Sequence, residues 1–458
     1  MGITFVEKSE GRQRHDAKIA LVLAGGAISG GAFKIGGLIA LNSLLTNRSV
    51  NDFEIYVGTS AGAFLAAPLA AGVGPEELLR SIDGRSDTIS QFSPMQFYRP
   101  NIREFIRKPM MLGRDALGVL PGLSLATLRV FGRNRSKMIH LTRQFLQSPS
   151  WQNAEQLVTP VLRDVSRRSG LQTGLSYLPS GLFDNSGIEE FIRTNFERNG
   201  IPNHFKLLKM EKGKDLYLGA TNLNTAEAVI FGHDEDSSVT ISQAVQASTA
   251  IPGFFRPPRI HGNDYLDAGV RKTANISQAV QKGAQLIIAY NPFRPYVNYH
   301  ADQLLNDQRS LSDLGILTVI NQAFRTLLHT RLMLGIEKLQ LDQDFHGDVI
   351  LLEPSEDDLD FFDVNPLAFW RRAESAFYGY VSVKEAIERH YPRVDSILQR
   401  YGIRSDLGRL QRSTDEIRRA RYDVGAILDV LETVTHPRSA AATGGQGGGR
   451  PSLRVVNG

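Results

Sequence analysis

The sequence predicts an α/β fold of three layers, α/β/α, with a mainly parallel central sheet. Short apolar runs typical of buried strands alternate with longer apolar stretches typical of helices, and glycine-rich turns join them. A strand, a turn, a helix and a second strand follow one another within residues 19–69, which is the order of a parallel α/β unit. The 458 residues are 42% hydrophobic and 22% charged, a composition that allows a sizeable core.

The expected elements follow the spacing of apolar residues along the chain. Residues 1–16 are polar and mixed in charge, and we expect a lead-in there that lacks the apolar core of a signal peptide. Apolar runs and alternation predict strands at residues 19–23, 53–57, 216–220, 226–231 and 286–289. Apolar residues at helical spacing predict helices at residues 32–45, 63–69, 241–248 and 311–341.

The C-terminal part of the chain has a different pattern. Residues 301–435 are mostly helical in spacing, and Ser413 with Glu416 forms a capping box before further apolar residues. Residues 436–458 contain an Ala/Gly-rich run and are expected to be a disordered tail. Residues 17–300 are therefore expected to form the main domain, with an insertion or cap at about 90–180.

One strand runs directly into a serine turn. Gly58 and Gly62 flank Ser60 in the spacing G-x-S-x-G, which lifts a serine onto a strained strand-to-helix elbow. A side chain at either glycine would crowd the turn and block a substrate. Ser60 would then lie at a helix N-terminus, where free N–H groups favour developing negative charge. The same residues are also compatible with a serine that only caps the helix.

The glycine-rich turn at residues 24–31 has three interpretations. A dinucleotide site needs G-x-G-x-x-G and an acidic residue about twenty positions later. Ala27 occupies the middle glycine position, Asn42 is not acidic, and Asp52 is too far along. The second interpretation is an oxyanion hole, made by bare N–H groups at a helix N-terminus. The third is a tight turn that needs glycine for its dihedral angles.

Charge is concentrated in one segment. The net charge is +4, but residues 99–143 carry ten basic residues against two acidic ones, a local charge of +8. Apolar residues lie between these charges, which favours contact with an anionic lipid surface. A solvated helical face with a buried side explains the pattern equally well. Nucleic-acid binding is not expected, because the aromatic residues are not interleaved as stacking platforms.

Cysteine usage and hydropathy exclude several classes of site. The chain has no cysteine, which excludes disulfides, thiolate catalysis and zinc–thiolate centres. Residues 234–236 are acidic but lack the spacing of metal ligands. No apolar run reaches the roughly 18 residues of a membrane span. We therefore expect a cytoplasmic or peripheral membrane protein, and export by another route stays open.

Four short blocks follow one another along residues 18–292. They are the glycine-rich residues 23–38, the elbow Gly58–Gly62, the run Ala-Ser-Thr-Ala-Ile-Pro-Gly-Phe-Phe at 247–255, and Asp267-Ala268-Gly269 with Asn275. In this order and spacing they resemble the oxyanion, nucleophile-elbow, A-S-x-A-I-P-x-x-F and D-G-[GA] blocks of the patatin-like phospholipases. One block is a weak signal, but four in order are specific.

The resemblance implies a serine–aspartate dyad in place of a triad. Ser60 would attack an ester carbonyl, and Asp267 would accept its proton and later activate water, with an acyl-enzyme between the two steps. Backbone N–H groups of the glycine-rich block would hold the oxyanion. The candidate positions are Gly25, Gly26, Ala27, Ser29 and Gly30. The later histidines lie outside any recognisable catalytic block, so a Ser–His–Asp triad is not expected.

The implied reaction is hydrolysis of phospholipid or lysophospholipid esters, with no metal or cofactor. Two blocks depart from the family pattern. In the oxyanion block, usually G-G-G-x-R/K-G, Ala27 replaces the third glycine and Ser29 replaces the basic residue, and Ala268 replaces the glycine of D-G-[GA]. These changes remove no catalytic atom and bear on substrate choice. A carboxylesterase for small soluble esters and a non-catalytic lipid- or anion-binding module stay open as alternatives.

Overall fold

The structure is a computed structural model that describes residues 2–9, 12–111, 130, 132, 135–149, 153–160, 177–299 and 310–411. The strands of its main sheet are β1 (Ile3–Glu7), β2 (Lys18–Leu23), β3 (Ile55–Gly58), β5 (Asp215–Asn222), β6 (Ala228–Phe231), β8 (Arg259–Ile260), β9 (Asn263–Leu266), β10 (Ala284–Tyr290) and β11 (Asp348–Leu352). A second, two-stranded sheet pairs β4 (Gly181–Phe183) with β7 (Gly253–Phe255).

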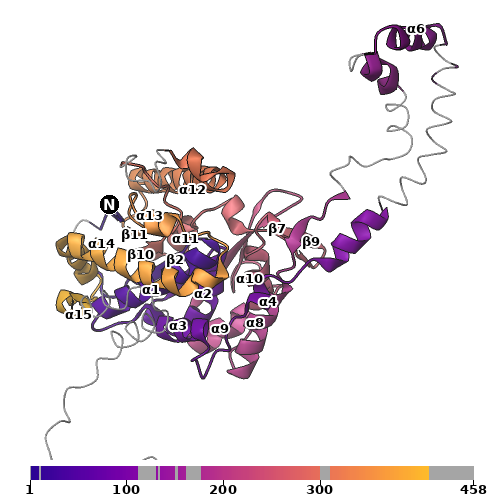
Figure 1. Ribbon diagram of the computed structural model, residues 1–458. Coiled ribbons are helices and arrows are strands. Elements are labelled where there is room, and N and C mark those ends of the chain that lie inside the picture. Colours follow the sequence, from indigo (N-terminus) through magenta and orange to yellow (C-terminus); the bar gives the residue numbers. More distant parts are fainter. Residues whose placement is uncertain are drawn as a thin grey trace, which may run out of the picture.

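Most of the helices lie around the main sheet, whereas α6 (Arg135–Gln147) lies apart from it (Figure 1). The helices are α1 (Ala27–Leu44), α2 (Ala61–Ala70), α3 (Pro75–Asp83), α4 (Pro94–Phe97), α6, α8 (Ser186–Arg198), α9 (Phe205–Lys212), α10 (Ile241–Ser248), α11 (Ile276–Gln281), α12 (Ile316–Leu341), α13 (Leu359–Phe362), α14 (Arg372–Arg400) and α15 (Leu407–Gln411). The short 3-10 helix η7 (Phe369–Arg371) precedes α14.

The main sheet is mostly parallel. Its strand order is β1-β11-β10-β2-β3-β5-β9-β8, and β6 pairs with β5 outside this path. The neighbours from β11 through β10, β2 and β3 to β5 are parallel. The pairs β1–β11, β5–β6, β5–β9 and β8–β9 are antiparallel. The predicted α/β fold with a mainly parallel sheet is confirmed.

Alternation along the strands sends side chains into two separate cores. Leu21, Leu23 and Tyr56 pack in the larger core with residues of α1, α2 and α14. Val22 and Val57 point to the other face and pack with residues of α11 and α12. Because successive side chains of a strand lie on opposite faces, two buried faces need helices on both sides. The sheet is therefore the middle of three layers (Figure 1).

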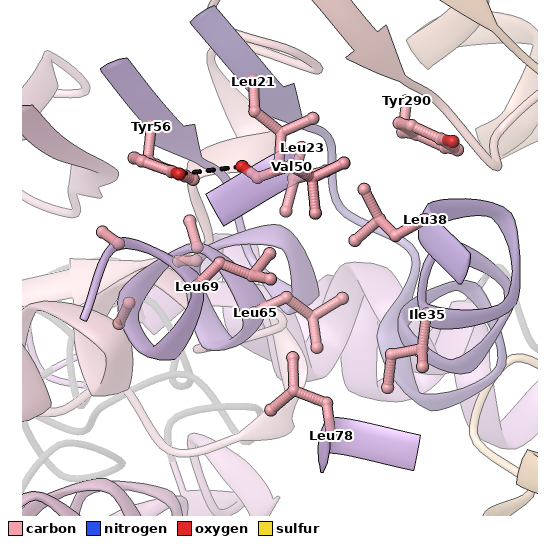
Figure 2. Close-up of a cluster of buried hydrophobic side chains, with 14 of the residues drawn as sticks. Leu21, Leu23, Ile35, Leu38, Val50, Tyr56, Leu65, Leu69, Leu78 and Tyr290 are labelled. Atoms are coloured by element: carbon pink, nitrogen blue, oxygen red, sulfur yellow. Dashed lines mark hydrogen bonds between the residues drawn. The ribbon is translucent and has the colours of Figure 1, made fainter. Parts of the chain in front are cut away.

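The larger core joins the glycine-rich helix to the sheet. Figure 2 shows Ile35 and Leu38 of α1 facing Leu65 of α2 below strands β2 and β3. The buried Tyr56 hydroxyl donates a hydrogen bond of 2.8 Å to the Val50 carbonyl, which satisfies its one polar atom. The layer that carries the glycine turn and the serine elbow is thus fixed by apolar packing from both elements.

Two strands lie where the sequence predicts none. The polar lead-in at residues 1–16 contains β1, and the helical region at 301–435 contains β11. The two pair antiparallel at one edge of the sheet, and β11 pairs with β10. Each is only five residues long, and its partner is distant in sequence, so local periodicity gave little signal. The main sheet therefore continues beyond residue 300, where the main domain was expected to end.

Helix α1 begins earlier and is longer than predicted. By length and composition it could cross a membrane, but 78% of it is buried inside the fold. It packs closely against α14, because Gly36 and Gly379 let the two backbones approach. A Cβ at Gly36 would lie 1.8 Å from the Ala376 carbonyl oxygen, and one at Gly379 would lie 1.9 Å from that of Phe33. This helix is a core element of the protein.

Parts of the basic segment and the C-terminal region fall within the described residues. Residues 102–111 are helical, and α6 forms a second helix of the 99–143 segment. The C-terminal region is helical in α12, α14 and α15, apart from β11. The capping box at Ser413 and Glu416 and the glycine-rich residues 436–458 lie outside the described residues.

Candidate active site

Ser60 lies at a strained turn between β3 and α2. Its dihedral angles are φ 56° and ψ −126°, and it is the N-cap residue of α2. The flanking glycines are required by close approach. A Cβ at Gly58 would lie 2.5 Å from the Ala63 Cα atom, and one at Gly62 would lie 2.0 Å from the Leu23 carbonyl oxygen. A positive φ at a non-glycine residue costs free energy, and such strain is typical of functional turns.

Asp267 lies directly after β9 and meets Ser60 from another part of the chain. The Ser60 side chain is close enough to the Asp267 carboxylate to lower its pKa. The Gly269 N–H donates a hydrogen bond of 2.7 Å to the carboxylate. Burial raises the pKa of Asp267 to about 6, although the Ser60 side chain, the Gly269 N–H and the charge of Lys34 act in the opposite direction. An aspartate with this pKa is ionised at neutral pH and can accept a proton from the serine.

The block at residues 247–255 connects the serine and the aspartate. The Ser248 hydroxyl oxygen accepts a hydrogen bond of 2.9 Å from the Ser60 backbone N–H. The Asp267 N–H donates a hydrogen bond of 2.8 Å to the Ala250 carbonyl. In the sequence, this block carries part of the family resemblance, but its pattern indicates no role for Ser248. Its buried hydroxyl fixes the position of the elbow.

The glycine-rich turn leads into α1 next to the elbow. Gly26 has a φ of 145°, which favours glycine, and Ala27 has a φ of 51°. Gly25 contacts the serine turn, because a Cβ on it would lie 3.2 Å from the Ser60 Cβ atom. Among the hydrogen bonds of the described residues, none is donated by the backbone N–H of Gly25, Gly26 or Ala27. Within the described part of the chain, these three N–H groups therefore have no protein acceptor.

Two of the five predicted oxyanion positions differ from this arrangement. The Ser29 N–H donates to the Pro366 carbonyl at 3.2 Å, and the Gly30 N–H donates to the Gly26 carbonyl at 2.8 Å. Because α1 begins at Ala27, the Gly30 N–H closes the first turn of the helix. In this structure, the Ser29 and Gly30 N–H groups are therefore already paired with protein carbonyls.

Lys34 is a charged residue of this site that the sequence analysis did not select. Its side chain is fully buried, and Nζ donates a hydrogen bond of 2.8 Å to the Gly25 carbonyl. Burial lowers the pKa of Lys34 to about 7, and the charge of Asp267 partly opposes this shift. Lys34 lies within an apolar run of α1, where the pattern indicated only a helix position.

An apolar pocket opens beside Ser60. Its volume is about 120 Å³, and it is lined by residues of α1, α2, α8 and η7. Three aromatic rings form part of its wall, with centroid distances of 5.2 Å for Phe64–Phe92, 5.6 Å for Phe64–Phe191 and 4.9 Å for Phe92–Phe191. A wall of this kind suits a hydrocarbon chain. The reacting end of such a chain would reach Ser60.

Other candidate groups have structural partners. Asp234 and Glu235 form ion pairs with Lys282, with N–O distances of 2.9 and 2.6 Å. Within the described ranges, no cluster of three or more His, Asp or Glu side chains could hold a metal ion. His261 lies in the turn between β8 and β9 and has a φ of 48°, as expected of a turn residue.

The family can now be read from the sequence match as well as the geometry. The family model described as patatin-like phospholipase matches residues 21–280, more than half of the chain. The chain belongs to the patatin-like phospholipase family. It is accordingly a hydrolase of the lipid acyl hydrolase class, and its matched region contains the elbow, the glycine-rich turn and Asp267. A search of curated proteins finds no match.

Three solved structures show distant likeness. VipD from Legionella pneumophila is 14% identical with a TM-score of 0.35, over 94% of this chain and 82% of that one. ExoU of Pseudomonas aeruginosa, solved with SpcU, is 14% identical with a TM-score of 0.26, over 94% and 69%. Human group IVD cytosolic phospholipase A2 is 11% identical with a TM-score of 0.31, over 84% and 59%. The family assignment rests on the sequence model and not on these scores.

Proposed function

We propose that this protein hydrolyses acyl esters of phospholipids or lysophospholipids with Ser60 as nucleophile and Asp267 as general base. The observation that carries the proposal is that Ser60, on its strained turn, lies close enough to the buried Asp267 carboxylate to lower its pKa and also lines an apolar pocket. A nucleophile that lies close to its base and lines an apolar pocket is suited to acyl transfer.

In the first step, the Ser60 oxygen attacks the ester carbonyl while its proton moves to Asp267. The carbonyl oxygen becomes an oxyanion, which the free N–H groups of Gly25, Gly26 and Ala27 would stabilise. The intermediate collapses, the C–O bond to the alcohol breaks, and Asp267 returns the proton to the leaving oxygen. In the second step, Asp267 takes a proton from water and the hydroxide attacks the acyl-serine. The C–O bond to Ser60 breaks, Asp267 returns the proton to the Ser60 oxygen, and the fatty acid leaves.

The pocket supports a lipid substrate over a small soluble ester. Its wall of phenylalanine side chains would bury an acyl chain and gain free energy with each methylene removed from water. A short ester would leave most of the pocket unfilled. The proposal also includes peripheral contact with an anionic membrane through the basic segment 99–143, because a phospholipid substrate has to be taken from a lipid surface.

The experiment compares hydrolysis of a fluorogenic phospholipid with that of a short p-nitrophenyl ester. The proteins are the wild type, Ser60→Ala, Asp267→Asn and the control Asp348→Asn, which removes a buried carboxylate at the far edge of the sheet. Thermal melting and circular dichroism check that each is folded. We expect activity in the wild type and in folded Asp348→Asn, and none in the other two. Full activity of Asp267→Asn would refute the dyad, and a preference for the short ester would favour the esterase alternative.

A further inference from the structure

One cleft of the described structure is lined mainly by charged residues. Its volume is about 550 Å³, and the charged lining residues are Arg103, Glu104, Arg107, Arg256, Arg259 and Asp264. Four cations against two anions leave an excess of two positive charges, and we name this the arginine cleft. Arg256 directly follows the pocket residue Phe255, and Asp264 lies on β9, which leads into Asp267. Two of its lining residues therefore lie on segments that also carry residues of the active-site region.

The two acids of the cleft are already bound by protein groups. The Arg259 guanidinium donates two hydrogen bonds to Asp264, at 2.8 and 2.6 Å. Glu104 accepts hydrogen bonds from the Ser180 N–H at 2.7 Å and from its hydroxyl at 3.0 Å. These contacts neutralise or occupy the carboxylates, so they oppose an incoming anion less than free acids would.

Cations of the cleft have unused hydrogen-bond donors. Arg103 and Arg107 form no ion pair within the described part of the chain. Arg256 pairs with Asp184 at 2.8 Å, but its buried Nε has no hydrogen-bond partner. Guanidinium groups with free N–H donors match the oxygens of a phosphate in number and geometry.

The helix that carries two of these arginines has an exposed apolar face. The positions i, i+3, i+4 and i+8 of residues 102–111 lie on one face. They are Ile102, Phe105, Ile106 and Met110, which are 59%, 46%, 58% and 69% exposed. A helix with an apolar face toward solvent and arginines at its flank has the composition of an interfacial lipid-binding helix.

We propose that the arginine cleft binds the phosphate of a membrane phospholipid while the apolar face of helix 102–111 enters the same lipid surface. This proposal deepens the proposed function, because it defines where the bilayer meets the enzyme. The excess positive charge selects an anionic bilayer as the partner. The neighbouring apolar residues select a lipid surface over free phosphate, which offers nothing for them to bury.

The test measures binding of the Ser60→Ala protein to vesicles by co-sedimentation, so that hydrolysis plays no part. Vesicles contain phosphatidylcholine alone or with phosphatidylserine. The variants are Arg103→Gln/Arg107→Gln and Ile102→Ser/Ile106→Ser. The matched control is Arg198→Gln/Lys206→Gln, which removes two exposed cations of α8 and α9. Inorganic phosphate is titrated separately by calorimetry.

We expect stronger binding to the anionic vesicles, and an affinity loss of about tenfold or more for each cleft or face variant but not for the control. Added salt should weaken binding of the wild type. Vesicle binding unchanged in both variants overturns the proposal. So does phosphate binding without vesicle binding, which would identify a soluble-phosphate site. Hydrolysis of a soluble ester is measured in proteins that retain Ser60, and it should be the same for the wild type and all of these variants. A failure of the membrane-binding proposal can then be distinguished from a failure of the proposed dyad.

A second inference comes from the buried lysine beside the glycine-rich turn. Lys34 donates its hydrogen bond to the carbonyl of Gly25, the residue that contacts the serine turn. The family pattern has a basic residue at the position of Ser29. In this chain, the cation near the glycine-rich turn is instead Lys34, which lies further along α1. Among the described residues, Lys34 and Asp267 interact electrostatically. The charge of Asp267 raises the pKa of Lys34, and the charge of Lys34 lowers the pKa of Asp267.

We infer that Lys34 is a positioning residue, which holds the Gly25 carbonyl and thereby aims the N–H groups of the turn at the reacting carbonyl. A peptide plane held at its carbonyl end has a fixed N–H direction at the next residue. A displaced donor loses much of its effect, since oxyanion stabilisation depends on geometry. This role rests on the proposed function of Ser60.

The test compares soluble-ester kinetics of Lys34→Met, Lys34→Gln and the control Lys384→Met, another buried lysine, which pairs with Glu388 on α14. Methionine removes the donor and the charge, whereas glutamine keeps a donor. We expect kcat to fall about 10- to 100-fold in Lys34→Met with little change in KM, and to recover in large part in Lys34→Gln. Both variants lose the charge, so the acid limb of kcat/KM should move to higher pH in both.

A role in stability alone would leave the pH profile unmoved. The inference is overturned if folded Lys34→Met keeps kcat within about threefold of the wild type, or if the acid limb stays in place in both variants. If Lys34→Met does not fold, the pH profile of kcat/KM for Lys34→Gln decides whether the inference stands. Ser60→Ala is assayed alongside, and activity in that variant would instead refute the proposed function.

Discussion

Lys34 and the arginines of the cleft are positive charges in opposite environments. Lys34 is fully buried and has one hydrogen-bond acceptor, the Gly25 carbonyl. The Arg259 side chain is 72% exposed. Burial lowers the pKa of Lys34 to about 7, so the fold spends free energy to keep a cation there. The exposed arginines cost far less, because water solvates them.

Because of this difference, Lys34 interacts mainly with groups inside the protein, and the arginines of the cleft interact mainly with a partner outside it. A charge in a dry interior interacts strongly with its neighbours and is screened little by salt. Lys34 can therefore tune groups within the site, such as Asp267. Exposed charges interact weakly one by one, and together they act on a partner outside the protein. Chemistry and lipid contact should thus be separable by mutation.

The largest expected effect comes from Asp267→Asn. Loss of the base should lower kcat on a soluble ester by about 10³-fold or more, since a base and its nucleophile act as a unit. Binding to anionic vesicles should not change. Arg103→Gln/Arg107→Gln should show the reverse pattern. An Asp267→Asn protein that is folded but loses vesicle binding would show that the two regions are coupled.

Ser248→Ala should have the next largest effect. It removes the acceptor of the Ser60 backbone N–H, so the elbow loses one of its supports. A buried unpaired N–H costs about 1–3 kcal/mol, and a displaced nucleophile slows the reaction. We expect a 10- to 100-fold lower kcat and a lower melting temperature. The control is Ser242→Ala on the same helix, which breaks a hydrogen bond to Glu189.

Ser242→Ala should lower the melting temperature and leave kcat nearly unchanged, because Glu189 is on α8 and makes no contact with Ser60 among the described hydrogen bonds. Equal losses of kcat in the two variants would contradict the positioning role of Ser248. They would assign both effects to general destabilisation of α10.

The pH dependence of activity tests the burial of Asp267. Only the ionised carboxylate can accept a proton, and burial raises its pKa to about 6. As pH falls below that value, kcat/KM on a soluble ester should drop about tenfold per unit. Stability is measured at each pH to exclude unfolding. If kcat/KM instead falls only near the ordinary pKa of an aspartate, Asp267 is not in the dry environment that distinguishes this region from the cleft.

Local patterns predicted much of the fold and of the site. The elbow could be predicted because Gly58 and Gly62 meet a steric need within one turn, and the matched region contains Ser60 and Asp267. The α/β order followed from alternating apolar runs. In each case, the residues that decide the structure are close together in sequence.

The parts that could not be predicted depend on distant partners. Strands β1 and β11 form at the sheet edge only because they pair with each other and with β10. The Ser29 N–H is occupied by the carbonyl of Pro366, which no local pattern reveals. The burial of Lys34 in the site could not be predicted from the sequence, because a single lysine in an apolar helix more often extends its amine to water.

The smallest expected effect concerns Ala27, which stands where the family pattern has glycine. Its φ of 51° is unfavourable for an alanine by about 1 kcal/mol, but glycine loses more conformational entropy on folding. Ala27→Gly should therefore change the free energy of unfolding by less than about 1 kcal/mol and keep kcat, because the backbone N–H is retained. The matched control is Ala226→Gly, in the turn between β5 and β6, with a φ of 56°. Equal small shifts in melting temperature would show that the alanine affects only backbone strain. A clear loss of kcat in Ala27→Gly alone would mean that the alanine side chain, which lines the pocket, contributes to substrate binding.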